Sequence, residues 1–325
     1  MNDGKAMGKT KNIAYCAAAV LIACFLLFPL YWALNTSLKT EKEIFQNPPT
    51  FYPHEVNTAS YAAQVESGDF NMFRSFGNSF LISMGSMAIA VVLAVPASYG
   101  IAKYRFKGRK LALLSFLVTQ MLPVSVLLTP MFIMFKNMHV YDTWWAAILA
   151  DATIGIPFSV LILKNYFASI PSDLEEAAYL DGCNRFTAFV RILIPIAKPG
   201  VMVCAIFSFL YAWGDLAYGM TFILDQEMRP ITAGIFNFMG QYGTKWSYLT
   251  AFAVVTIIPV ALLLVLISAS LNAVEIHDGL GIEHLHLGDV GHVGGVVADL
   301  GGVGAVITRA RGTSSSILIN RSRFT

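Results

Sequence analysis

Four residues inside long apolar stretches have side chains that could bind a solute: two carboxylates and two aromatic rings. Asp215 lies near Trp213 and Tyr218, and Asp151 lies in another apolar stretch. A carboxylate accepts hydrogen bonds from hydroxyl groups, and an aromatic face packs on a ring of the solute. The alternative is that these side chains make structural hydrogen bonds or contact a partner chain. In either role, the two carboxylates must be placed by elements that are otherwise apolar.

Other motifs that could do chemistry fail on spacing. The segment 4–10 is one residue too short between its glycines for a phosphate-binding loop and follows no strand. In the segment 279–284, His284 stands where a dinucleotide fingerprint has its third glycine. Neither HExxH nor GxSxG occurs, so the chain is not expected to be an enzyme, and an intramembrane enzyme is a remote alternative. No metal site is expected from the glycine-flanked histidines of the tail or from the scattered cysteines, which are Cys16, Cys24, Cys183 and Cys204.

The composition is that of a membrane protein. Of the 325 residues, 56% are hydrophobic and 13% are charged, which is about half the charged fraction of a soluble domain. The formal net charge of +2 does not favour binding to nucleic acid. Six windows are long enough to cross a bilayer as helices and are apolar all round, whereas β-barrel strands would be shorter and alternating. The predicted spans are Ile13–Leu34, Ser79–Ala102, Leu111–Phe135, Trp144–Ala168, Val201–Leu224 and Tyr248–Leu271.

The distribution of Lys and Arg between the connections predicts the orientation. Of the 22 Lys and Arg residues, 15 fall in the termini and the connections on their side, Lys164 lies near the same side at the end of the fourth span, and six fall on the other side. Because positively charged connections stay in the cytoplasm, both termini are predicted to be cytoplasmic. The first span is expected to be a retained signal anchor, because no cleavage site follows it. The expected domains are a cytoplasmic N-terminus at 1–12, a six-span domain at 13–272 and a tail at 273–325.

The connection 169–200, between the fourth and fifth spans, carries the most informative local pattern. Ser172 and Glu175 have the spacing of a capping box, which predicts a short helix. Gly182 is placed to end that helix in the left-handed conformation. Such a helix and glycine turn also occur in loops without a special role. The two alanines on one face of this helix would let a partner approach closely. That face consists of Leu174, Ala177, Ala178 and Asp181.

A second short helix is expected after Asn184, and Pro195 and Pro199 are expected to break the chain before the fifth span. The spacing of the whole segment is Glu-Ala-Ala, three residues, Gly, nine residues, Ile, one residue, an apolar residue and Pro. This pattern is similar to the EAA loop of ABC importer permeases. The residues that carry it are Glu176, Ala177, Ala178, Gly182, Ile192, Ile194 and Pro195, with Ile194 where the family usually has leucine.

Further stretches resemble the smaller permease subunit of maltose and multiple-sugar importers. The resemblance covers about residues 13–272 and includes 99–109, 120–123, 213–215 and 229–232. It implies an all-α membrane protein with six transmembrane helices in the type I (MetI-like) permease fold and a cytoplasmic coupling helix. In that family the EAA loop contacts a separate ATPase, whose closure on ATP rocks the spans between inward-facing and outward-facing states. The residues of the EAA pattern are then coupling residues and not catalytic ones.

The resemblance also implies partners and a location. The expected protein is a subunit of a bacterial inner-membrane importer that translocates a sugar or oligosaccharide. Its expected partners are a second permease in a heterodimer, an ABC ATPase dimer and an extracytoplasmic sugar-binding protein that docks on 35–78 and 225–245. No cofactor is expected, because the partner ATPase uses the ATP. Asp215, Trp213, Tyr218 and Asp151 would line the sugar path. The alternatives are an importer of a polyamine or glycerol phosphate and, remotely, a stand-alone channel.

The tail departs from the family, which ends soon after the sixth span. Residues 273–325 are rich in glycine and histidine and contain Phe324 as their only aromatic residue. The sequence therefore predicts a disordered extension or a shifted reading frame near Asn272.

Overall fold

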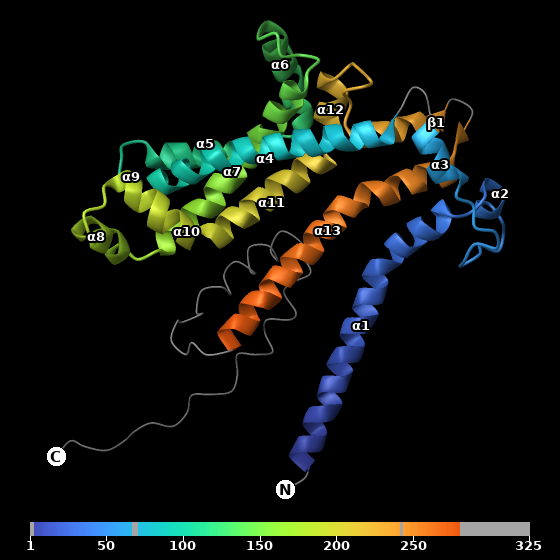
Figure 1. Cartoon of the computed structure of the whole chain (residues 1–325), viewed down its shortest axis with the longest axis horizontal. Coiled ribbons are helices and arrows are strands. Elements are labelled where there is room, and N and C mark those ends of the chain that lie inside the picture. Colours follow the sequence, from blue (N-terminus) through green and yellow to red (C-terminus); the bar gives the residue numbers. More distant parts are fainter. Residues whose placement is uncertain (1–2, 67–70, 241–242, 280–325) are drawn as a thin grey trace. The chain divides into compact units, whose positions relative to one another are not determined.

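The structure is a computed structural model that describes residues 3–66, 71–240 and 243–279 (Figure 1). The chain divides into two compact units, Met1–Leu264 and Val265–Thr325, and the packing that places the candidate sites lies within the first. The last helix continues to Gly279; the rest of the predicted tail lies outside the described residues. The helices are α1 (Asp3–Ser37), α2 (Glu41–Ile44), α3 (Ala59–Glu66), α4 (Met72–Lys103), α5 (Arg109–Met121), α6 (Val124–Asn137), α7 (Trp144–Ser169), α8 (Asp173–Leu180), α9 (Arg185–Ala188), the π-helix η1 (Phe189–Leu193), α10 (Ile194–Ile196), α11 (Lys198–Gly214), α12 (Ala217–Phe222), the 3₁₀ helix η2 (Ile231–Phe238) and α13 (Trp246–Gly279), and the strands are β1 (Met239–Gly240) and β2 (Gly243–Thr244).

Four of the six predicted spans are confirmed as single helices that are long and apolar enough to cross a bilayer. Each contains at least 18 residues, close to the length that spans the hydrocarbon core. Prolines lie inside all four helices, as membrane helices tolerate. These spans are Tyr15–Ser37, Met72–Lys103, Trp144–Ser169 and Trp246–Leu263.

The predicted span Leu111–Phe135 is not one straight helix. The chain forms α5 and α6, and the helix axis bends by 105° between them. The break lies at Pro123, which has no backbone N–H to continue α5. Leu122, the residue before it, is extended at φ −75° and ψ 126°, as a residue before proline prefers. The pair is therefore a sharply bent span or a re-entrant segment.

The predicted span Val201–Leu224 also contains a break. Helix α11 ends at Gly214, Asp215 is extended, and the shorter α12 follows. The Asp215 carboxylate accepts hydrogen bonds from the backbone amides of Tyr218 at 2.9 Å and Gly219 at 3.0 Å. The carboxylate thus satisfies the free amides of a new helix start, which favours a break over continuation of α11.

The core of the first unit is formed where α4, α7 and α11 pack against one another (Figure 1). Gly155 of α7 lies at their crossing, since a Cβ there would come within 2.9 Å of Ser208 Oγ and 3.2 Å of Ala90 Cβ. Small residues at such crossings let membrane helices approach closely. By contrast, the side chains of α5 are all at least partly exposed.

The segment between α1 and α4 forms a small structure between the first two spans. It contains α2 and α3, and Glu43 of α2 holds the intervening loop. The Glu43 carboxylate accepts hydrogen bonds from the Thr50 hydroxyl at 2.8 Å and the His54 amide at 3.0 Å. Glu41 accepts from the amide and hydroxyl of Ser247, which ties α2 to the start of α13.

Candidate functional site

Helix α8 forms the first half of the predicted coupling loop, but it does not begin with a capping box. Ser172 has helical angles (φ −65°, ψ −26°), and its side chain makes no capping hydrogen bond. The Glu175 side chain is turned instead toward Lys103 at the end of α4, with 3.2 Å between Nζ and Oε1. The capping-box prediction is therefore wrong, because Glu175 is part of a long-range ion pair.

The end of α8 is as predicted. Gly182 has a φ of +84°, a conformation that glycine adopts without strain. The Cys183 amide donates to the Ala178 carbonyl at 2.9 Å, and the Gly182 amide donates to the Tyr179 carbonyl at 3.1 Å. This pair of bonds is the Schellman arrangement, which satisfies the last carbonyls of a helix.

The predicted coupling residues of α8 do not share one environment. Glu176 and Ala177 are exposed, but Ala178 is 2% exposed and packs within the chain. Helix α8 contacts α9 and η1, which accounts for the burial of Ala178. The face predicted to meet a partner is therefore divided, and only part of it is free.

Two exposed apolar side chains flank the glycine turn, and the sequence analysis missed them. Leu180 is 89% exposed and Phe186 is 74% exposed. Large apolar side chains in a polar connection are the signal that would have identified them, since exposed apolar groups gather at interaction sites.

The second half of the loop leads into the fifth span. Asn184 caps α9 as predicted, because its Oδ1 accepts from the Thr187 amide at 2.8 Å. Pro195 lies inside α10. The helix axis bends by 75° at Ala197, between α10 and α11. Pro199 is in the first turn of α11, where its missing N–H is no loss. Ile192 and Ile194 are half-buried, and Pro195 is exposed.

Of the four residues expected along a solute path, Trp213, Tyr218 and Asp151 are buried and Asp215 is half-buried. Trp213 is 2% exposed, and its indole Nε1 donates to the Thr256 carbonyl at 3.0 Å. It packs with Phe76 and Phe209. Tyr218 is fully buried and stacks on Phe222, in a different cluster. The structure therefore does not bring the two aromatic rings to one surface.

The two carboxylates also differ in environment. Asp215 is occupied by capping α12. Asp151, in α7, is 2% exposed, and its Oδ1 has no hydrogen-bond partner among the residues that the structure describes. Other buried polar atoms without a hydrogen-bond partner among the described residues include the hydroxyls of Ser83, Ser86, Ser159 and Ser208. An ionisable side chain inside the membrane, such as that of Asp151, is a candidate functional residue.

A cavity of about 480 Å³ lies elsewhere, between the end of α1, α2 and the start of α13. Its lining includes Trp32, Lys39, Glu43 and Trp246 and none of the four predicted path residues. Among the described residues, no group of three His, Cys, Asp or Glu side chains is placed to hold a metal ion.

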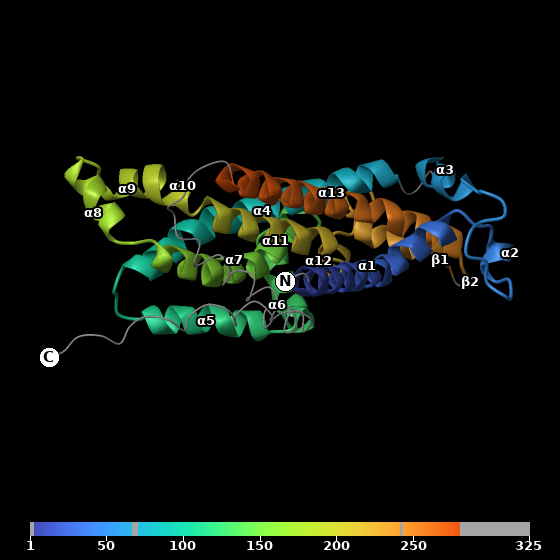
Figure 2. The ribbon, with the colours of Figure 1, turned by 90° about the horizontal axis from the view of Figure 1, so that it is seen from below.

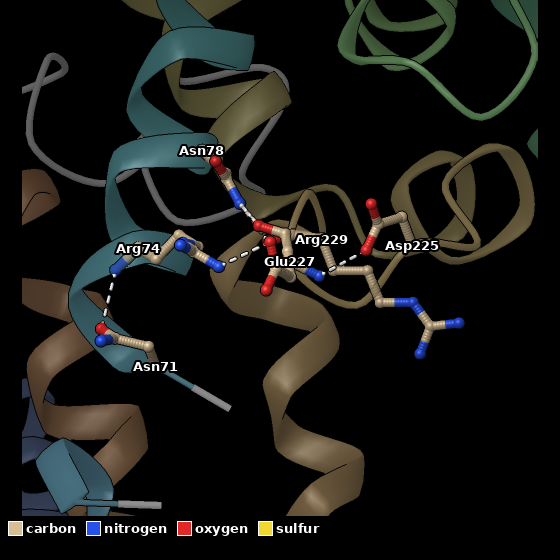
Figure 3. Close-up of polar contacts among 6 residues, drawn as sticks. All are labelled: Asn71, Arg74, Asn78, Asp225, Glu227 and Arg229. Atoms are coloured by element: carbon tan, nitrogen blue, oxygen red, sulfur yellow. Dashed lines mark hydrogen bonds and ion pairs between the residues drawn. The ribbon is translucent and has the colours of Figure 1, made fainter. Parts of the chain in front are cut away.

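A further polar cluster joins the start of α4 to the loop after α12 (Figure 3). Arg74 and Asn78 point from α4 toward this loop, where Arg74 pairs with Glu227 at 2.8 Å. Asn78 Nδ2 donates to the carbonyls of Glu227 at 2.7 Å and Arg229 at 3.1 Å. Ser79, the residue after Asn78, accepts a hydrogen bond from the Ile231 amide at 2.8 Å.

Comparison with known proteins gives consistent matches. Residues 87–275 match the family model described as "Binding-protein-dependent transport system inner membrane component". A sulfoquinovosyl glycerol transport system permease of Agrobacterium fabrum is 33% identical over 79% of this chain and 89% of the relative. A trehalose transport system permease of Mycobacterium tuberculosis is 30% identical over 78% of this chain and 92% of the relative.

A solved structure shares the fold. It is a chain of a bacterial ABC transporter involved in the import of the acidic polysaccharide alginate, with a TM-score of 0.68 at 18% identity. The match covers 80% of this chain and 96% of that chain. The predicted permease fold is thereby confirmed.

Proposed function

This chain belongs to the family of binding-protein-dependent transport system inner membrane components, and we propose that it carries a sugar or oligosaccharide as one permease of a bacterial ABC importer. Support for a carbohydrate comes from relatives named for sulfoquinovosyl glycerol, diacetylchitobiose and trehalose. A polyamine or glycerol phosphate is not favoured, because none of these names includes such a solute.

The observation that carries the proposal is the surface around Gly182. An acidic helix and a glycine turn are flanked there by two exposed apolar side chains, Leu180 and Phe186. This is the composition of a protein contact. We assign the contact to a partner ATPase, with Glu176 and Ala177 on its rim and Gly182 holding the turn. Ala178, Ile192 and Pro195 shape the loop from within.

The rest of the assembly follows from this assignment. A second permease would complete the pathway against the exposed faces of the spans, and an extracytoplasmic binding protein would dock on 35–78 and 225–245. Both termini would lie in the cytoplasm, on the side of the coupling loop. The chain would need no cofactor of its own.

In this proposal, the four residues predicted along the solute path do not contact the solute in the conformation described here. Asp215 maintains the break between α11 and α12, and Trp213 holds α11 to α13. Asp151 and Tyr218 are buried side chains that would contact solute only after the helices move.

Co-purification from native membranes tests the assignment of Leu180 and Phe186. We expect a Leu180→Asp, Phe186→Asp variant to lose the ATPase and to keep the second permease. A Phe45→Asp variant is the matched control, because Phe45 is 69% exposed in the segment predicted to be external. Equal recovery of the ATPase with all three chains would contradict the assignment.

Uptake tests the choice of solute. Cells that depend on this chain should take up labelled trehalose or diacetylchitobiose, and uptake should stop in the double variant. Uptake of labelled putrescine or glycerol 3-phosphate in place of any sugar would overturn the carbohydrate assignment.

A further inference from the structure

Helix α4 is attached at its C-terminal end to the coupling loop. Lys103, its last residue, pairs with Glu175 of α8, and the two side chains are only 13% and 12% exposed. Lys103 Nζ also donates to the Ile170 carbonyl at 2.7 Å, just before α8. Since Glu175 Oε1 has no aligned hydrogen-bond donor, the Glu175 contact is a charge pair and the Ile170 contact is the directional bond. One cation thus holds two points of the loop.

Aromatic packing reinforces this attachment. Tyr99 of α4 stacks on Phe189 of η1, with 4.6 Å between ring centroids, and packs edge-on against Phe167. The guanidinium of Arg185 lies over the ring of Tyr104, 5.7 Å from its centroid. The end of α4 therefore contacts the coupling loop on both sides of the glycine turn.

The N-terminal end of α4 is attached to a different connection. Asn78 donates to the carbonyls of Glu227 and Arg229, and Ser79 accepts from the Ile231 amide (Figure 3). Asn78 is 6% exposed and Ser79 is 2% exposed, so these bonds are shielded from solvent. The loop 225–231 is thereby fixed to α4.

One helix joins the two attachments. Its 32 residues correspond to about 48 Å at 1.5 Å per residue. Both views place α8 and α9 near one end of α4 and α3 near the other (Figures 1 and 2). Packing against α7 and α11 holds α4 along its length, including the region of Pro96, where Val95 and Tyr99 are buried. A rigid element of this kind can carry coupling between distant sites.

We propose that Lys103 is the positioning residue through which movement of the coupling loop reaches α4, and that α4 transmits it to the loop 225–231. This inference rests on the proposed function, because it presumes that an ATPase moves α8. It adds a defined route. The route begins at the contacts of Lys103 with Glu175 and the Ile170 carbonyl, which we call the clamp, and follows α4 to the hydrogen bonds of Asn78 and Ser79. The ATPase and the solute would then influence each other through α4, since coupling is reciprocal.

The first test removes the charge of Lys103. A Lys103→Met variant should still recover the ATPase and the second permease, but sugar uptake should fall about tenfold, within the range typical of coupling between sites. Lys103→Arg should restore uptake, because a guanidinium can contact both Glu175 and the Ile170 carbonyl. Lys107→Met is the matched control, since Lys107 is exposed four residues further on.

The second test replaces the ion pair by a covalent link. Lys103→Cys and Glu175→Cys are introduced into a chain whose four natural cysteines are replaced by alanine. The reduced form should transport about tenfold less than the cysteine-free chain, and a flexible bis-maleimide should restore transport to within about twofold. Restoration would show that α8 and the end of α4 move as one body.

The outcomes separate this inference from the proposed function. If the natural chain recovers no ATPase, the proposed function fails. If the natural chain recovers the ATPase but Lys103→Met transports like the natural chain, the clamp is overturned. The clamp is also overturned if cross-linking abolishes the transport that remains, because the two elements must then separate during the cycle.

Discussion

At the residue scale, buried polar and aromatic side chains have structural roles that the sequence alone does not distinguish from solute binding. Trp213 is an example, since an aromatic residue beside Asp215 is typical of a sugar path. In the structure its indole N–H is bonded to Thr256 and its ring packs on Phe209. Trp213 therefore holds two helices together.

Replacement of Trp213 tests this role. Trp213→Phe should remove the hydrogen bond to Thr256, which typically stabilises a protein by about 1 kcal/mol, and keep most of the packing. The apparent KM for the transported sugar should stay unchanged while the unfolding midpoint in detergent falls. A raised KM without a change in stability would instead identify Trp213 as a solute contact.

At the scale of elements, α4, α7 and α11 are held together by small residues. Gly155→Ala should destabilise the protein by about 1–3 kcal/mol, because its Cβ would lie 2.9 Å from Ser208 Oγ. Gly100→Ala in α4 is the control, since a Cβ there meets nothing within 4 Å. Thermal unfolding of the two purified variants measures the difference, and equal midpoints would be evidence against the tight crossing.

The segment between α1 and α4 should be sensitive to acid through Glu43. Burial raises the pKa of Glu43, but hydrogen bonds from His54 and Thr50 and the nearby charges of His54 and Lys39 lower it by more, so the pKa is below its usual value. A lowered folded-state pKa contributes stability above the unfolded pKa of about 4.3 and loses it as the pH falls through the folded pKa.

Limited proteolysis between pH 7 and pH 3 measures this effect. Cleavage near Thr50 should increase as the pH falls below about 4.3, because protonated Glu43 no longer holds the loop as a carboxylate. Glu43→Gln should be cleaved more readily at pH 7 and should show little further change on acidification. The same pH profile in both chains would exclude Glu43 as the cause.

The limits of prediction are also clearest at the scale of elements. Long apolar windows identified every span region, and the left-handed glycine at 182 was predictable because its spacing ends an acidic helix. Pro123 predicts a kink in the third span, but the bend of 105° was not predictable, because apolar residues flank the proline on both sides. The ion pair of Lys103 with Glu175 joins positions far apart in sequence, so no local pattern shows it, and the apparent capping box misled the prediction.

At the scale of the whole molecule, the chain is a permease subunit, and its central feature is the loop that would receive force from a partner. Its membership in the transport family and its fold are shown by the family match and the relatives. The coupling role rests on the exposed Leu180 and Phe186 beside Gly182. A stand-alone channel would need no such surface.

Photo-cross-linking from position 180 tests the central claim most directly. A benzophenone amino acid replaces Leu180 in the full chain in native membranes, and the adduct is identified by mass spectrometry. Position 56 is the control, because Val56 is also exposed at 67% but lies in the segment between the first two spans. We predict an adduct with a P-loop ATPase from position 180 and none from position 56. Active transport without an ATPase adduct at position 180 would contradict the coupling account.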